Sequence, residues 1–285
     1  MKRNFYSLYD ANIREKFSKK FNDQKWLNER IKINELTEFC QYSYPMEDFK
    51  NIFKQNFLNI GNFEKGLCKL LDENLPSGDI CSVASGEAVK EYYLLKNQTK
   101  SRNYYCSDLF YDKQLNLASE LVKEKNIKNR IFAYEEPVNA IKLPYKDNRF
   151  DGCFVAGVIY SLDDDELIKH ISELLRVTKK NGKIIFWCLS FIPPLMKIKL
   201  IINKIFKTNH NNFKKNVGFE RDVSEISKIL NNFENLNILW KKRMFIEVGK
   251  NYSFSAFRRI LQKIPIIKNL WLYIDYKAYV ICLKK

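Results

Sequence analysis

The stretch DICSVASGEAVKEYYLLKN, from Asp79 to Asn97, decides the fold. Its first part, ICSV, is typical of a short buried strand, the small residues ASGEA predict a turn, and a helix follows. α/β proteins hold nucleotides on such a strand, turn and helix at the edge of a parallel sheet. The turn has a single glycine, Gly86, so downstream sequence must distinguish a cofactor loop from a simple tight turn.

Composition narrows the class of protein. The chain has 285 residues, of which 46% are hydrophobic, enough for a sizeable core. No apolar run reaches the roughly 18 residues that span a bilayer, and the first residues, MKRNFYSLYDANIREK, hold no apolar signal segment. We therefore expect a cytoplasmic protein.

The formal net charge of +16 would suit nucleic acid, an anionic membrane surface or an anionic small substrate. Asn, Ile, Phe and Tyr are abundant alongside Lys, which also fits a lysine-rich solvated surface encoded by an AT-rich genome. Dense Arg with regularly interleaved aromatic residues is missing, so we predict no nucleic-acid partner.

The seven cysteines form no CxxC pair and no Cys/His cluster, so we predict neither a metal site nor disulfides. Five of them lie in predicted strands, where cysteine behaves as a small buried hydrophobe: Cys81, Cys106, Cys153, Cys188 and Cys282.

Strand-like and helix-like segments alternate after residue 76, which predicts right-handed crossovers and a mostly parallel sheet. Predicted strands cover 79–83, 103–107, 130–134, 151–157, 183–189, 236–248 and 277–285, and predicted helices cover 88–97, 111–126, 164–180 and 223–233. Residues 1–75 are predicted to form a helical cap or lid. Residues 76–285 form the predicted core, in which 190–220 is a basic insertion on the carboxyl side of the sheet, where ligands bind.

Four segments in order resemble the class I S-adenosylmethionine-dependent methyltransferases, of the small-molecule type 11 kind. Ala84, Gly86 and Ala88 stand at the family's Gly-x-Gly-x-Gly positions, and Ser82 replaces its usual acid. Asp108 comes 22 residues after Gly86 and matches the acid that binds the ribose hydroxyls. An N-cap is the alternative role for this aspartate.

The run NAIKLPYKDNRFDGCFVAG resembles the family's DA-x-x-LPF segment and fourth strand, and ELLRVTKKNGKIIFWC resembles the run into its fifth strand. The resemblance implies a Rossmann-like, doubly wound sheet of seven strands with S-adenosyl-L-methionine as cofactor and S-adenosyl-L-homocysteine as product. It also implies that the cofactor is bound by Ala84, Ser85, Gly86, Glu87, Asp108, Leu109, Asn139, Ala140, Ala156 and Tyr9.

Catalytic candidates are fewer. His210, in the insertion, and Tyr160, where many relatives carry histidine after the fourth strand, are the two we name. We expect His170, on the helix predicted at 164–180, to lie at the surface or its boundary. The lysines of the insertion favour an acceptor that is already an anion and needs no general base.

Three hypotheses of function stay open. The first is O-methylation of a small or carbohydrate-linked acceptor that bears a phosphate, phosphoramidate or nucleotide, as in carbohydrate biosynthesis. The second is methylation of a quinone or lipid by peripheral contact with a membrane. The third is a binding protein that has lost catalysis. The sequence does not set the oligomeric state.

Overall fold

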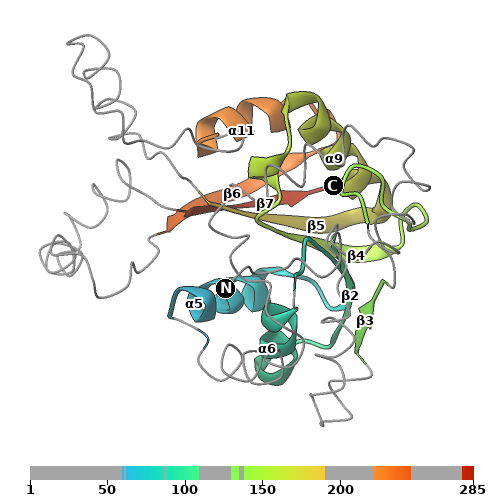
Figure 1. Cartoon of the computed structure of the whole chain (residues 1–285), viewed down its shortest axis with the longest axis vertical. Helices are drawn as coiled ribbons and strands as arrows, with labels where there is room; N and C mark the ends of the chain where they lie inside the picture. The colour runs from blue at the N-terminus through green and yellow to red at the C-terminus, as the bar shows by residue number, and fades with distance from the viewer. Residues whose placement is uncertain are drawn as a thin grey trace, which may run out of the picture.

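The computed structural model describes residues 60, 62–86, 88–108, 130–134, 138–189, 221–244 and 278–285. Within them lies one sheet of seven strands in the order β3-β2-β1-β4-β5-β7-β6 (Figure 1). The strands are β1 (Gly78–Val83), β2 (Arg102–Ser107), β3 (Ile131–Ala133), β4 (Phe150–Ala156), β5 (Thr178–Leu189), β6 (Asn237–Met244) and β7 (Ala278–Lys284). Neighbouring strands are parallel from β3 to β5, while β7 is antiparallel to both β5 and β6. This is the doubly wound sheet that the sequence predicts.

Helices cover both faces of the sheet (Figure 1). On one face lie α5 (Asn62–Asn74) and α6 (Val89–Asn97); on the other lie α9 (Asp164–Val177) and α11 (Val223–Leu230). Alternate residues of each strand point to opposite faces, so Ile80 packs toward α5 and α6 whereas Cys81 packs toward α9 and α11. Strands buried on both faces explain why the sequence shows apolar runs rather than strict alternation.

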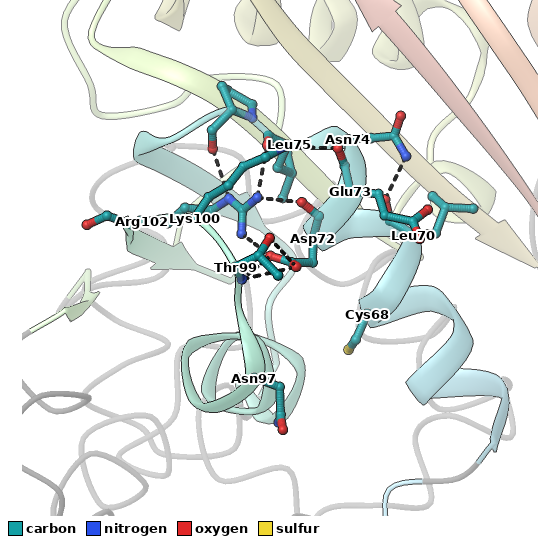
Figure 2. Close-up of polar contacts among 12 residues, drawn as sticks. Cys68, Leu70, Asp72, Glu73, Asn74, Leu75, Asn97, Thr99, Lys100 and Arg102 are labelled. Atoms are coloured by element: carbon teal, nitrogen blue, oxygen red, sulfur yellow. Dashed lines mark hydrogen bonds and ion pairs between the residues drawn. The ribbon is translucent and has the colours of Figure 1, made fainter.

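A buried arginine fastens α5 to the sheet (Figure 2). Arg102, the first residue of β2, is fully buried and pairs with Asp72 at 2.5 Å. Its Nη2 donates to the carbonyls of Asp72 and Leu75, and its Nε donates to that of Pro76. The guanidinium thereby satisfies carbonyls at the end of α5 that no helical amide reaches.

The end of α9 fastens the loop that precedes β4. Arg176 donates to the carbonyls of Leu143 and Tyr145 at 2.9 and 2.7 Å, while Glu173 accepts the backbone N–H of Leu143 at 2.7 Å. These bonds join the LPY segment to the helix. They matter for the site because Asn139 and Ala140 lie just before this segment.

Two sequence predictions need qualification. The helix predicted at 164–180 ends at Val177, because Thr178 pairs with Phe150 and begins β5. The cap predicted at 1–75 lies outside the described residues except for residue 60 and 62–75, of which α5 contributes Leu67 and Leu71 to the core under the sheet. The insertion predicted at 190–220 lies wholly outside the described residues.

The six cysteines among the described residues are free, and the five in the strands are buried, as predicted. No helix in the described part of the chain is long and apolar enough to cross a membrane.

Candidate cofactor site

Strand register brings three predicted site segments together at one edge of the sheet. Val83, the last residue of β1, pairs with Ser107 of β2 and with Val155 of β4. Parallel strands end at the same edge, so the residues that follow these three, Ala84, Asp108 and Ala156, come side by side. The glycine-poor turn and the β2 aspartate therefore lie next to each other, and their role as one cofactor site stays a prediction.

The turn after β1 keeps a glycine-like backbone although two glycines are absent. Ala84, Gly86 and Ala88 have φ values of 57°, 55° and 53°. This left-handed region costs an L-residue roughly 1 kcal/mol relative to glycine. The positive φ values fall on the three positions at which the resembled motif has glycine. The turn therefore has the backbone of that motif although alanine disfavours it at two of these positions.

One bond within the turn and two bonds to the end of β2 hold this turn. The N–H of Ser85 donates to the carbonyl of Ser107 at 3.2 Å, and that of Ala88 donates to the carbonyl of Ser85 at 3.0 Å. The N–H of Gly86 donates to Oδ2 of Asp108 at 2.9 Å. Gly86 is exposed, and a Cβ built on it would meet no atom within 4 Å, so the space above the turn is open.

The predicted adenine segment joins the same network. Val138 donates its N–H to the carbonyl of Asp108 at 2.9 Å, which places the following Asn139 and Ala140 beside the end of β2. Oδ1 of Asn139 accepts the N–H of Ile141 at 3.1 Å. One lone pair of this oxygen is therefore engaged in the turn, and the second is left for a ligand amine.

His170 contradicts the expectation of a surface residue. It is fully buried, and its Nδ1 lies 2.8 Å from the carbonyl oxygen of Ala140. Burial lowers the pKa of His170 to about 4, so the ring is neutral and Nδ1 carries the donated proton. The spacing with Leu167, Ile171 and Leu174 on the inner face of α9 was the signal for burial.

The end of β4 supplies small residues. Ala156 is 9% exposed, and Gly157 has a φ of 74° and donates its N–H to the carbonyl of Trp187 at 3.0 Å. The short 3-10 helix η2 (Ile159–Ser161) follows, and Tyr160 lies in it. The backbone of Tyr160 is thus close to the edge of the sheet in sequence and in space, while its catalytic role stays a prediction.

The helix α6 begins at Val89, one residue after the start of the helix predicted at 88–97. Its N-cap, Ala88, makes no side-chain capping bond. Its first amides therefore face the turn without a side-chain acceptor from the cap, an arrangement that suits a ligand carboxylate.

One buried pair escaped the sequence analysis. Glu91 on α6 is 1% exposed and accepts a short hydrogen bond from Oγ of Ser82, the residue that replaces the usual acid of the motif. Burial raises the pKa of Glu91. Its spacing with Ala88 and Leu95 on the inner face of the helix was the available signal.

Other predicted ligands lie outside the described residues: Tyr9, Glu87, Leu109 and the catalytic candidate His210. The described ranges hold no group of three or more His, Cys, Asp or Glu that could bind a metal ion.

A known protein family matches the part of the chain that holds the candidate site. Residues 83–186 match the family model described as a methyltransferase domain. This span runs from the end of β1 into β5 and so contains the turn, Asp108, Asn139 and Ala156.

Two solved structures share the fold at low sequence identity. A putative O-methyltransferase from Nostoc punctiforme PCC 73102 is 13% identical, with 83% of this chain and 60% of that one covered and a TM-score of 0.51. Geranyl diphosphate C-methyltransferase from Streptomyces coelicolor A3(2), solved with Mg²⁺, geranyl diphosphate and S-adenosyl-L-homocysteine, is 11% identical, with 78% and 80% covered and a TM-score of 0.50.

A curated relative adds little about activity. The "SCO2-like protein" of Rickettsia bellii (strain RML369-C) is 24% identical over 95 residues, which are 33% of this chain and 45% of that protein. The matched part thus spans less than half of this relative's length.

Proposed function

We propose that this chain, which carries a class I S-adenosylmethionine-dependent methyltransferase domain, binds S-adenosyl-L-methionine at the edge formed by β1, β2 and β4 and methylates a small-molecule acceptor. The observation that carries the proposal is the turn at 84–88. Three alternate residues hold positive φ there, and Asp108 bonds to the middle one. Strain of this kind is found where function requires a particular backbone.

The residues fit the parts of this cofactor. The carboxylate of Asp108 offers acceptors for a ribose diol, and the free lone pair of Asn139 offers one for the adenine amine. The first amides of α6 face the turn and suit the amino-acid carboxylate. Ala84 and Ala156 leave room for the chain of the ligand to pass close to the backbone.

When bound, the cofactor supplies an electrophilic methyl group for in-line displacement by an oxygen, nitrogen or carbon nucleophile. The protein's part is to hold that group and the acceptor about 3–3.5 Å apart and in line. Nδ1 of His170 donates to the carbonyl of Ala140 and so fixes the backbone at the proposed adenine side of the site. His170 is too deeply buried to act as the base, so we keep His210 and Tyr160 as the proposed catalytic candidates.

For the acceptor we propose an anionic small molecule, carbohydrate-linked and methylated on oxygen. The net charge of +16 and the lysines of 190–220 support this. Both ends of that segment adjoin the site. It leaves β5 at Leu189, and the chain returns at Arg221, whose guanidinium donates to the carbonyls of Ile159 and Leu162 around η2.

Calorimetric titration with S-adenosyl-L-homocysteine tests the cofactor site. Asp108→Asn keeps an oxygen for the N–H of Gly86 but removes the charge, and its affinity should fall about 10- to 100-fold, since a charge-assisted hydrogen bond contributes about 1.5–3 kcal/mol. Asp165→Asn, an exposed aspartate in the first turn of α9, is the matched control and should bind as the wild type does. Absence of binding by the wild type at millimolar ligand would refute the proposed function and favour the inactive binding protein.

Transfer of a labelled methyl group tests the acceptor class. Pools of sugar phosphates and nucleotide sugars should accept the label, whereas the same pools after phosphatase treatment should not. Anionic vesicles containing a quinone provide the competing assay. Labelling of the quinone, lost when Ile201, Ile202 and Phe206 are changed to Asp, would replace the anionic acceptor by the membrane hypothesis.

A further inference from the structure

His170 and Asn139 hold the same peptide group from opposite sides. Nδ1 of His170 lies 2.8 Å from the carbonyl oxygen of Ala140, and Oδ1 of Asn139 accepts the N–H of Ile141 at 3.1 Å. This carbonyl and this N–H belong to one planar peptide unit, which links Ala140 to Ile141. A chain of hydrogen bonds therefore runs from the imidazole on α9, through that peptide, to the side-chain amide of Asn139.

The imidazole can serve this chain in one form. A carbonyl oxygen only accepts hydrogen bonds, so Nδ1 of His170 must carry the proton that it shares with Ala140. The other ring nitrogen, Nε2, is buried and has no hydrogen-bond partner within the described ranges. A second proton there would bring a buried charge without compensation, so the ring is neutral, and the bond to Ala140 sets its tautomer.

The bond to Ile141 sets the orientation of the amide of Asn139. A backbone N–H needs an acceptor, so the amide oxygen faces it and the amide nitrogen cannot take its place. This oxygen keeps a second lone pair for a ligand. If the amide turned over to offer its nitrogen instead, the N–H of Ile141 would lose its acceptor in a segment where Asn139 is nearly buried.

We propose that His170 is a positioning residue for base recognition: through the Ala140–Ile141 peptide it keeps the amide oxygen of Asn139 in place for the exocyclic amine of adenine. The inference rests on the proposed function and adds a residue that acts through the backbone rather than on the cofactor. Its consequence is specificity. An oxygen held in this place favours a base with an amine over one with an oxo group, because two acceptors would then face each other.

Paired titrations with S-adenosyl-L-homocysteine and S-inosyl-L-homocysteine, which has an oxo group in place of the amine, measure this preference. The wild type should bind the adenosyl compound at least tenfold more tightly. His170→Phe keeps an aromatic ring but removes the donor, so the peptide can turn, and the ratio of the two affinities should fall at least fivefold. His170→Asn keeps a donor for the carbonyl of Ala140 and should keep most of the ratio.

Asn139→Asp separates positioning from a merely structural role. A carboxylate presents an oxygen whichever way it turns, so loss of the imidazole donor should no longer affect specificity. The double variant Asn139→Asp with His170→Phe should therefore recover the preference for the adenosyl compound that His170→Phe alone has lost. Thr178→Val is the control for lost stability: it removes a buried bond to the carbonyl of Leu174 at the end of α9 and should leave the ratio unchanged.

The wild type also provides a test that needs no variant. Long-range proton–nitrogen NMR spectra distinguish the two imidazole tautomers, and the buried histidine should be protonated on Nδ1. Protonation on Nε2, equal affinities of the wild type for the two ligands, or an unchanged ratio in a folded His170→Phe protein would overturn the inference and leave the proposed function standing. Failure of the wild type to bind either ligand at millimolar concentration would instead refute the proposed function.

Discussion

Acidification should destabilise this protein through one histidine. His170 is completely buried, and burial lowers its pKa from 6.5 to about 4. In the unfolded chain the imidazole takes up a proton at its ordinary pKa, whereas the folded protein excludes that proton until a much lower pH. Stability from the neutral ring is therefore complete above about pH 6.5 and is lost progressively as the pH falls toward 4.

The size of the effect follows from the two pKa values. One pKa unit corresponds to about 1.4 kcal/mol, so the difference between 6.5 and about 4 amounts to roughly 3 kcal/mol of unfolding free energy. Most of this should be lost between pH 7.5 and pH 4.5. For a domain whose total stability is about 5–15 kcal/mol, such a loss is large.

Urea denaturation at pH 7.5 and pH 4.5 measures the loss of unfolding free energy, and His170→Asn serves as the comparison. The asparagine amide can donate to the carbonyl of Ala140 as Nδ1 does, but it does not titrate. All other titrating groups, His210 among them, are common to both proteins and cancel in the difference. The wild type should lose about 2–3 kcal/mol more than the variant over this range.

Parallel losses in the two proteins would refute the reasoning. Should the variant fail to fold, the wild type itself offers a second test, because the chain has only two histidines. Proton NMR resolves their ring signals, and one of them should titrate near pH 4. Two ordinary titrations near pH 6.5 would show that His170 is accessible to water.

Two further predictions concern the turn at 84–88 and the bonds of Arg102 to the end of α5. Ala84→Gly relieves a φ of 57° and should raise the unfolding free energy, measured in urea titrations, by roughly 0.5–1 kcal/mol. This figure already allows for the greater entropy of glycine in the unfolded chain. A lower stability would mean that packing of the alanine methyl outweighs the strain of its backbone. Arg102→Lys removes the fork that binds Asp72 and the carbonyls of Leu75 and Pro76, and should lower the unfolding free energy by about 3 kcal/mol, whereas Arg149→Lys, at a half-exposed ion pair, should cost less than 1 kcal/mol. Equal effects of the two arginine variants would contradict the role given to the buried fork.

The spacing of apolar residues and the turn residues between segments were enough to predict the sheet. Runs such as ICSV and FDGCFVA are short, apolar and bounded by turn residues, and they alternate with helical segments, which predicted a mostly parallel sheet but not its strand order. The resemblance implied seven strands, and the described residues form a sheet of seven. Helix ends were harder: Val177 ends α9 because Thr178 gains a strand partner, which no local pattern reveals.

The cofactor edge could be predicted only in part. Asp108 was found by its distance from Gly86, and strand register then confirmed that the two meet. Glu91 and His170 were missed because a charged or titratable residue on a helix is ordinarily solvated, and their burial depends on packing between elements. The partner carbonyl of His170 lies 30 residues away in sequence, beyond the reach of any local rule.

The turn at 84–88 is shaped by its neighbours more than by its own residues. The carbonyl of Ser107 and the carboxylate of Asp108 accept the N–H groups of Ser85 and Gly86. Because these bonds hold the backbone, alanine can stand in place of glycine at a cost of roughly 1 kcal/mol in stability at each position. Such a loop can drift far from its sequence signature while its backbone path stays the same. A turn of this shape is better recognised by alternating left-handed dihedral angles and an adjacent acid than by a count of glycines.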